Sequence, residues 1–217
     1  MRPGLRVVDL NRFELKRVLC PRGVKRMSVS FRPAVRADAR EIARLFQISS
    51  EGCADYIWSQ MAQPGQQLLD VGEMRYARAG VIFSYENCWI AEAEGLVIGM
   101  MHSFVMRDDP DAQPETDPVL APYADMEIPD TLYISSLALH KGWRNLGLGA
   151  RFLLHAKARC GELGLTGLSL IDYAANTGAR RFYERHGFEI VKTCQITPHP
   201  LIRVTGEAYL MHCPLPS

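Results

Sequence analysis

The segment that most constrains this chain is residues 131–150, which read TLYISSLALHKGWRNLGLGA. An apolar run of strand character leads through a short turn into an amphipathic helix, and Arg144, Gly147 and Gly149 stand at the junction. Glycines let the main chain approach a ligand closely, and the first N–H groups of a helix are unpaired and partly positive. The segment therefore predicts an anion site built from backbone, to which Arg144 adds a forked donor.

These glycines have other interpretations. A plain glycine-rich turn without a ligand is the simplest alternative. A dinucleotide fingerprint expects a further glycine where the chain has Phe152, although Asp172 ends the next strand at the spacing of a ribose-binding acid. That interpretation is weak because only one clear strand–helix–strand unit is present. A P-loop is excluded, since no Gly-Lys-Ser/Thr follows Gly149.

A second motif lies just downstream. Residues 168–174 form another strand-like run, after which Asn176 stands at a natural helix N-cap and Gly187 at the matching C-terminal position. The residues that share one face of the helix between them are Ala179, Phe182, Tyr183 and His186. The sequence thus predicts a second strand–helix unit directly after the first.

The two motifs together read strand, R-x-x-G-x-G, helix, strand, N-x-x-A-x-x-x-Y-x-x-x-G-F. This order resembles the GCN5-related N-acetyltransferase (GNAT) family, whose enzymes move an acyl group from coenzyme A to an amine. The resemblance is strong over residues 131–191 and weaker over the rest from about Met27. It implies an α/β fold of the α+β type over residues 27–217, with a mixed, mostly antiparallel sheet flanked by helices on both faces. A length of 217 residues suits one such domain.

The resemblance also implies roles for particular residues. The strand at 135–139 would offer its main chain to the pantetheine arm of acetyl-CoA, and its splaying from 168–173 would open a slot for that arm. Asn176 would bond a pantetheine amide. Tyr183 would stand near the sulfur as general acid, or would instead be core packing with a buried hydroxyl. The residues implied for cofactor binding are Leu137, Ala138, Leu139, Arg144, Asn145, Leu146, Gly147, Leu148, Gly149, Ala150, Asn176, Ala179 and Tyr183.

The general base stays open. An alkylamine has a pKa near ~10.4, so a base, a water chain or the pocket itself must take up its proton at neutral pH. The candidates are Glu127, Glu92 and Asp172, and a water relay is the commonest alternative in the family. Asp172 interrupts an apolar strand, and a half-buried carboxylate there is expected to have a raised pKa. His102 and His140 are predicted to be strand residues with ordinary partners.

The acceptor side is less well marked. Tyr56, Trp58 and Met61, in a helical stretch at 54–61, are candidates for the acceptor pocket by resemblance, with core or lid packing as the alternative. Residues 107–130 carry five prolines and eight acids, whereas the family usually joins these strands tightly. Such a segment is either a solvated linker or an acidic flap that steers a cationic acceptor toward the site.

Composition separates the N-terminus from the rest. Residues 1–26 carry eight Lys/Arg and two acids. This basic extension would touch nucleic acid or a membrane surface, or is dispensable, which we favour. No apolar run approaches the ~18 residues of a membrane span. The six cysteines form no C-x-x-C pair, so we expect a reduced, cytoplasmic chain without a metal.

The predicted function is transfer of an acetyl group from acetyl-CoA to a primary amine of a small molecule or peptide, by direct attack. A non-catalytic acyl-CoA sensor is the alternative from another class. A nucleic-acid-associated protein ranks third, because beyond the basic extension the chain has no basic body or interleaved aromatic motif. The expected partner is a cationic amine, with neither nucleic acid nor membrane, and the resemblance allows a homodimer.

The helix at 147–163 is predicted to be amphipathic. The residues expected to face the sheet are Leu148, Phe152, Ala156, Cys160 and Leu163. The residues expected to face water are Arg151, His155, Arg159 and Glu162.

Overall fold

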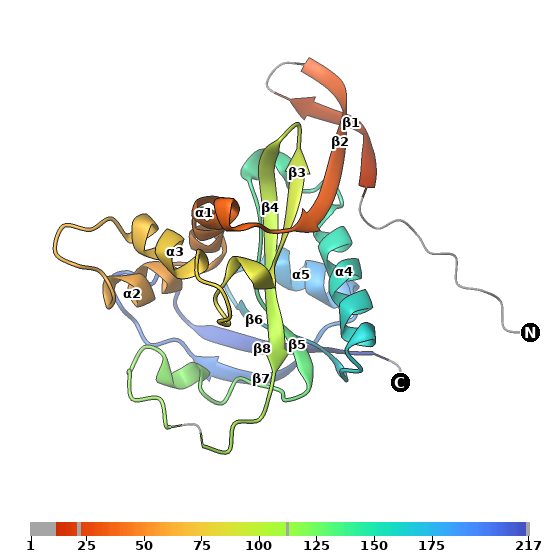
Figure 1. Ribbon diagram of the computed structural model, residues 1–217. Coiled ribbons are helices and arrows are strands. Elements are labelled where there is room, and N and C mark those ends of the chain that lie inside the picture. Colours follow the sequence, from red (N-terminus) through yellow and green to blue (C-terminus); the bar gives the residue numbers. More distant parts are fainter. Residues whose placement is uncertain (1–11, 21–22, 112, 216–217) are drawn as a thin grey trace, which may run out of the picture.

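The computed structural model describes residues 12–20, 23–111 and 113–215 of the chain, with side chains described from residue 28 onward. These residues form one sheet with helices on both of its faces (Figure 1). The strands are β1 (Arg12–Cys20), β2 (Gly23–Pro33), β3 (Cys88–Ala93), β4 (Leu96–Met106), β5 (Thr131–Leu139), β6 (Gly167–Tyr173), β7 (Glu189–Gln195) and β8 (Glu207–Pro214). The α-helices are α1 (Ala39–Ser49), α2 (Cys53–Ser59), α3 (Leu68–Tyr76), α4 (Leu148–Glu162) and α5 (Thr177–Arg185).

The sheet is mixed and mostly antiparallel, which confirms the predicted fold class. Its strand order is β1-β2-β3-β4-β5-β6-β8-β7, and β5 with β6 is the one parallel pair in the described part of the chain. β3 and β4 form an antiparallel hairpin. Its turn residues Glu94 and Gly95 both have positive φ, 50° and 78°, as a tight two-residue hairpin turn requires.

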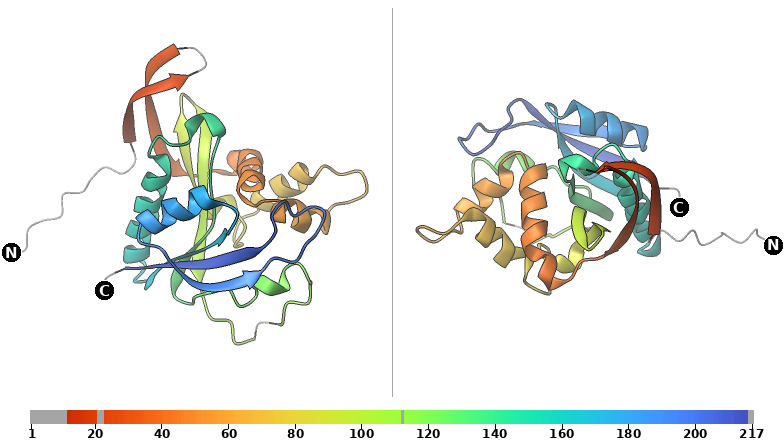
Figure 2. Two further views of the ribbon diagram at one scale, coloured as in Figure 1. Left: turned by 180° about the vertical axis from the view of Figure 1, so that it is seen from behind. Right: turned by 90° about the horizontal axis from the view of Figure 1, so that it is seen from above.

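Each face of the sheet has its own hydrophobic core, and helices cover both faces (Figures 1 and 2). On one face α1, α2 and α3 pack on β3, β4 and β5 through buried residues that include Ile42, Trp58 and Met100. On the other face α4 packs on the sheet through Leu148 and Phe152, and α5 lies next to it. The sheet therefore separates two layers, and its central strands are covered on both sides.

The prediction for the two faces of α4 is correct except at two positions. His155 is 8% exposed and its ring stacks 4.4 Å from that of Trp89, because α4 also lies under β2 and β3 and this contact widens its buried stripe. Leu163, expected to be buried, is 43% exposed. The helix ends at Glu162 and the chain turns at Gly164, with φ of 64°, so the helical phase no longer directs Leu163 inward.

A hairpin of β1 and β2 extends the sheet at its N-terminal edge. β2 pairs with β3 only over residues 29–33, whereas its first part pairs only with β1. The hairpin therefore projects beyond the rest of the sheet (Figure 1). Strand structure begins at residue 12, within the segment predicted to be a basic extension.

Trp58, one of the residues proposed for the acceptor pocket, lies in the core between α2 and α3. It is 1% exposed and stacks on Phe46 at 6.3 Å. Its ring lies directly against the backbone of α3, because a Cβ built on Gly72 would stand 2.4 Å from it. The absence of a side chain at Gly72 is what allows the two helices to approach this closely.

We expect Gly72→Ala to lower the free energy of unfolding by about 1–3 kcal/mol, because a methyl group there overpacks the indole. Urea unfolding measures this change. Gly161→Ala is the matched control, since Gly161 is also helical and a Cβ there meets nothing within 4 Å. A Gly72→Ala variant as stable as Gly161→Ala would show that Trp58 is not packed against α3.

The acidic segment is packed against the fold along part of its length. Asp117 accepts hydrogen bonds from the Tyr56 hydroxyl at 2.6 and 2.8 Å and from the backbone N–H of Val119 at 2.8 Å. Val119 and Met126 are buried, with exposures of 5% and 0%. The acidic segment is therefore bound to α2 through the Asp117 carboxylate and packed on the fold through Val119 and Met126, so it is not a solvated linker throughout.

Candidate active site

β5 and β6 separate shortly after they begin. They pair in parallel only over residues 131–133 of β5 and 167–169 of β6. The register between β5 and β4 then shifts between His102 and Ser103, which leaves Ser135 as an extra residue on β5. Such a bulge bends its strand. β6 instead stays paired with β8 along its whole length, so the two strands diverge and the predicted splaying is confirmed.

A cleft of about 700 Å³ opens where the strands diverge. Parts of β5, β6, α5, the end of α1 and the turn before α4 line it. The predicted cofactor residues among its lining are Leu137, Ala138, Leu139, Arg144, Asn145, Gly147, Gly149, Ala150, Asn176, Ala179 and Tyr183. Leu146 and Leu148 lie outside the lining, since Leu148, the first residue of α4, is fully buried in the core and Leu146 packs against the same cluster. The structure thus brings both sequence motifs to one cavity.

The N-terminus of α4 opens onto this cleft. Asn145 and Gly147 have φ of 62° and 79°, a left-handed backbone that asparagine tolerates and glycine adopts freely. A Cβ on Gly149 would lie 3.0 Å from the Phe182 ring, so this glycine allows α5 to approach the first turn of α4. The turn therefore presents unpaired N–H groups and the positive end of a 15-residue helix to a ligand.

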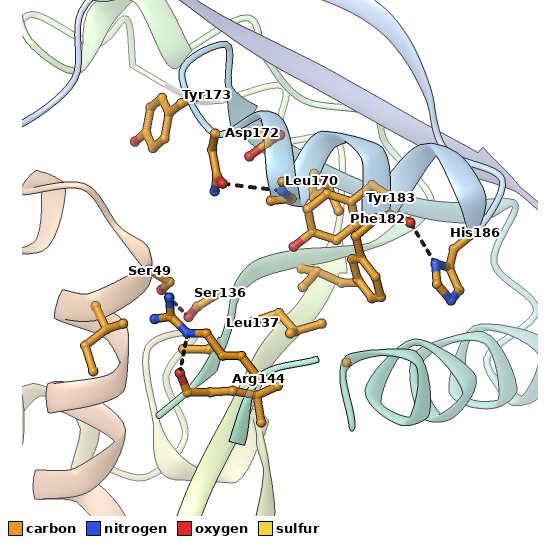
Figure 3. Close-up of a pocket in the computed structure, with 18 of the residues that line it drawn as sticks. Ser49, Ser136, Leu137, Arg144, Leu170, Asp172, Tyr173, Phe182, Tyr183 and His186 are labelled. Atoms are coloured by element: carbon orange, nitrogen blue, oxygen red, sulfur yellow. Dashed lines mark hydrogen bonds between the residues drawn. The ribbon is translucent and has the colours of Figure 1, made fainter. Parts of the chain in front are cut away.

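Two arginines line the same cleft. Arg144 and Arg185 line the cleft together with His186. The Nε of Arg144 donates to the carbonyl oxygen of Leu139 at 3.0 Å, which places the guanidinium across the end of β5 (Figure 3). The Nδ1 of His186 donates to the carbonyl of Phe182 at 2.7 Å. Helix end and arginines together make this cleft suitable for a phosphorylated ligand.

Asn176 caps α5 as predicted. Its Oδ1 accepts from the N–H of Ala179 at 3.3 Å, so its amide NH₂ is not used in the cap. Both residues line the cleft. An amide donor next to the first turn of α5 is a suitable partner for a carbonyl oxygen of an extended ligand.

Tyr183 lies on the cleft side of α5. Its ring packs between those of Phe182 and Phe188, at 5.3 and 5.5 Å, and its hydroxyl points into the open space (Figure 3). Burial raises the pKa of Tyr183 well above its ordinary value, and the nearby charge of Asp172 raises it further. The hydroxyl is therefore protonated at neutral pH and can donate a proton or a hydrogen bond.

Of the three carboxylates considered as a base, Asp172 is the one that lines the cleft. It is 4% exposed, its Oδ2 has no hydrogen-bond partner among the described residues, and burial raises its pKa to about 6. Glu92 is engaged with Arg32 at 2.8 Å on the neighbouring strands. Glu127 is exposed on the acidic segment and outside the lining, although partial burial raises its pKa.

We expect Asp172→Asn to stabilise the protein at pH 7 by up to about 3 kcal/mol. The folded-state pKa of Asp172 is raised from 3.8 to about 6, so the wild type loses stability as the pH rises through this window. The stability difference should therefore vanish below about pH 4 and reach its full size above about pH 6. Urea unfolding between pH 4 and 8 measures it. A difference that does not change with pH would contradict a buried, titrating Asp172.

The acceptor-pocket candidates do not line this cleft. Trp58 is core, Tyr56 is bound to Asp117, and Met61 is 45% exposed. Ser49 at the end of α1 lines it instead, with its hydroxyl 2.7 Å from that of Ser136 (Figure 3). Two adjacent serines, Ser135 and Ser136, interrupt the apolar strand at 131–139, and this pair is the sequence signal that could have indicated this side of the cleft.

Within residues 12–20, 23–111 and 113–215, no three His, Cys, Asp or Glu side chains gather to hold a metal ion. No helix in that same part of the chain is long and apolar enough to cross a membrane.

Comparisons with known proteins agree with this geometry. The acetyltransferase (GNAT) family profile matches residues 55–188. No curated protein matches the sequence closely enough to be counted as a relative.

Solved structures share the fold. An N-acetyltransferase from Staphylococcus aureus Mu50 superposes with a TM-score of 0.58 at 17% identity, covering 84% of this chain and 98% of that one. The ribosomal-protein-S18-alanine N-acetyltransferase from Escherichia coli gives 0.55 at 16%, over 86% and 93% of the two chains. The PaiA N-acetyltransferase from Thermoplasma acidophilum, in complex with coenzyme A, gives 0.54 at 14%, over 87% and 100%.

Proposed function

Since this chain belongs to the acetyltransferase (GNAT) family, we propose that it transfers an acetyl group from acetyl-CoA to a primary amine of a small molecule or peptide. The observation that carries the proposal is the single cleft that joins the N-terminus of α4 to Tyr183 through the gap between β5 and β6. One end suits a diphosphate, the gap suits an extended arm, and the far end holds a proton donor.

The residues present fit acetyl-CoA. The first turn of α4, with Gly147 and Gly149, would hold the diphosphate, and Arg144 would add charge-assisted hydrogen bonds. Among the residues that the structure describes, no strand pairs with β5 on its β6 side beyond residue 133, so its main-chain groups there are available to pantetheine amides. Asn176 would add its side-chain amide. When bound, acetyl-CoA supplies an activated thioester.

The chain's own groups would then handle two protons. Tyr183, held neutral by its raised pKa, would donate its proton to the departing thiolate. Asp172, with a pKa of about 6, would be mostly ionised at pH 7 and would accept the amine proton, directly or through one water. Burial raises the pKa of both side chains, but from different ordinary values, so that Tyr183 stays protonated while Asp172 is mostly ionised, which supports an acid and a base in the same cleft.

A cationic acceptor is supported by the charges near the site. Glu51 and Asp172 line the cleft, and the acidic segment is clasped to α2 next to them through Asp117. These carboxylates would raise the local concentration of an ammonium before it loses its proton. The Escherichia coli structural neighbour is named for an alanine of a ribosomal protein, which makes a peptide amine one of the acceptors to test.

The test is release of the CoA thiol from acetyl-CoA in the presence of putrescine, spermidine, tyramine, lysine or a peptide with a free N-terminus. We expect at least one amine to accelerate release above the rate without amine. Calorimetric binding of acetyl-CoA with no release for any amine would support the acyl-CoA sensor instead. No binding would overturn both functions.

We propose that residues 1–26 are dispensable for this activity. Among the residues whose side chains the structure describes, from residue 28 onward, none that lines the cleft comes from β2, and the part of β2 that pairs with β3 begins at residue 29. Deletion of residues 1–26 should therefore change kcat/KM by less than about twofold. A large fall in kcat/KM, with acetyl-CoA binding retained, would assign the extension to the acceptor side.

A further inference from the structure

His102 is a buried polar side chain that the proposed proton transfers do not use. It lies on β4, is 0% exposed, and its ring stacks on Phe83 at 5.2 Å and meets the edges of Tyr76 and Phe104 at 5.6 and 5.7 Å. Burial lowers the pKa of His102 to about 4. The imidazole is therefore neutral at pH 7, with one nitrogen that donates and one that accepts.

The surroundings of His102 determine which nitrogen carries the hydrogen. Its Nε2 lies 2.9 Å from the carbonyl oxygen of Ile82, which can only accept, so Nε2 is the donor. Its Nδ1 must then be the acceptor, and this atom lies 2.5 Å from the Oγ of Ser135. The Ser135 hydroxyl therefore donates its single hydrogen to His102.

This bond changes what Ser135 can offer to a ligand. Ser135 is the extra residue of the β5 bulge, and it lines the cleft where β5 leaves β6. A free serine hydroxyl both donates and accepts, but one that has given its hydrogen to His102 can only accept. Ser135 thus presents lone pairs alone.

We propose that Ser135 positions the acceptor amine by accepting one of its N–H groups, and that His102 positions Ser135 for this task. The proposal rests on the proposed acetyltransferase function. A neutral primary amine attacks through its nitrogen lone pair. A hydroxyl oxygen that accepts a hydrogen bond from an N–H group of the amine leaves the nitrogen lone pair free. A hydroxyl that instead donated its hydrogen to the amine would occupy that lone pair. Because the Ser135 hydroxyl donates its hydrogen to His102, Ser135 does not donate it to the amine nitrogen, and the amine remains nucleophilic.

The experiment uses the full-length chain and the panel amine with the highest kcat/KM. Because a hydrogen bond to the amine is lost, Ser135→Ala should lower kcat/KM for the amine about tenfold. The KM for acetyl-CoA should stay within about twofold, since one neutral hydrogen bond on the acceptor side is removed. Ser135→Thr, which keeps the hydroxyl, should retain most of the activity.

A double-mutant cycle tests the part played by His102. His102→Leu should lower kcat for the amine, because it frees the Ser135 hydrogen, whereas His102→Asn keeps an acceptor near the Nδ1 position and should recover activity. In the Ser135→Ala background, His102→Leu should have no further effect on kcat. Thermal unfolding of each variant identifies losses that come from instability.

The outcomes separate this proposal from the proposed function. Wild-type activity that is unchanged in Ser135→Ala, or additive effects of Ser135→Ala and His102→Leu, would overturn the positioning role alone. An equal rise in the KM values for amine and acetyl-CoA would also overturn it, since that pattern indicates a structural role. Absence of CoA release from the wild type with every panel amine would overturn the enzyme function, and the positioning role with it.

Discussion

Replacing Tyr183 with phenylalanine is expected to lower kcat by about 10²–10³-fold, the contribution of a positioned general acid. The affinity for acetyl-CoA should change little, because the ring would still pack between Phe182 and Phe188. Only the hydroxyl that points into the cleft is removed. Steady-state kinetics with the best panel amine measures kcat, and calorimetry measures the dissociation constant.

Tyr209→Phe is the matched control for this prediction. Tyr209 lies on β8 outside the cleft, and its hydroxyl donates to Glu207 at 3.2 Å. Its loss should leave kcat within about twofold, because neither Tyr209 nor Glu207 lines the cleft. A Tyr183→Phe variant with the wild-type kcat would remove Tyr183 from the mechanism and leave it a packing residue. A fall confined to acetyl-CoA affinity would assign it to binding.

Gly149→Glu should weaken acetyl-CoA binding by about 100-fold or more, since a carboxylate would then stand where the first turn of α4 binds a diphosphate. Its Cβ would also stand 3.0 Å from the Phe182 ring. A glutamate in the first turn of a helix is itself favourable for helix stability. The variant should therefore fold, and calorimetric titration with acetyl-CoA measures the change.

Two further variants interpret this result. Gly161→Glu introduces the same charge near the other end of α4, where a Cβ meets nothing within 4 Å, and should bind acetyl-CoA as the wild type does. Gly149→Ala separates the steric effect of a side chain from the effect of its charge. Its affinity for acetyl-CoA should fall about tenfold, which is less than the fall in Gly149→Glu. Equal losses in Gly149→Glu and Gly161→Glu would mean that the negative charge acts from anywhere on the helix. The anion site would then lie elsewhere.

Asp172 is expected to affect both the stability of the protein and the proposed proton transfer. A carboxylate with a buried oxygen that has no hydrogen-bond partner in the described chain lowers stability at neutral pH. Its place in the cleft beside Tyr183 supports a role in proton transfer. If Asp172→Asn gains stability above about pH 6 and loses kcat, the two measurements together would identify a residue retained for function.

Much of the fold was predictable because its signals are local. Helical spacing and caps placed α4 and α5, and an apolar run placed β5. The Glu94-Gly95 turn placed the β3–β4 hairpin. In each case the residues that determine the backbone are within a few positions of one another. The predictions were wrong where residues far away in the sequence change the surroundings of a side chain. His155 is an example, because Phe31 of β2 and Trp89 of β3 pack on it.

The half of the cleft proposed to hold the diphosphate and pantetheine was predictable for the same reason. Gly147 shapes the turn before α4 and Asn176 caps α5, so their positions in the sequence already imply their geometry. The acceptor half was not predictable. It depends on pairs far apart in the chain, such as Ser49 with Ser136, and Tyr56 with Asp117.

By itself, then, the sequence determined the strand–turn–helix units and the backbone of the proposed anion site, because a helix end and a left-handed glycine are properties of adjacent residues. Tertiary structure alone decided which polar groups meet at the acceptor end. The hydroxyl of Ser135 is an acceptor only because His102, on another strand, is bound to Ile82 from a third segment. A hydrogen-bond direction of this kind depends on three parts of the chain at once, and no local pattern encodes it.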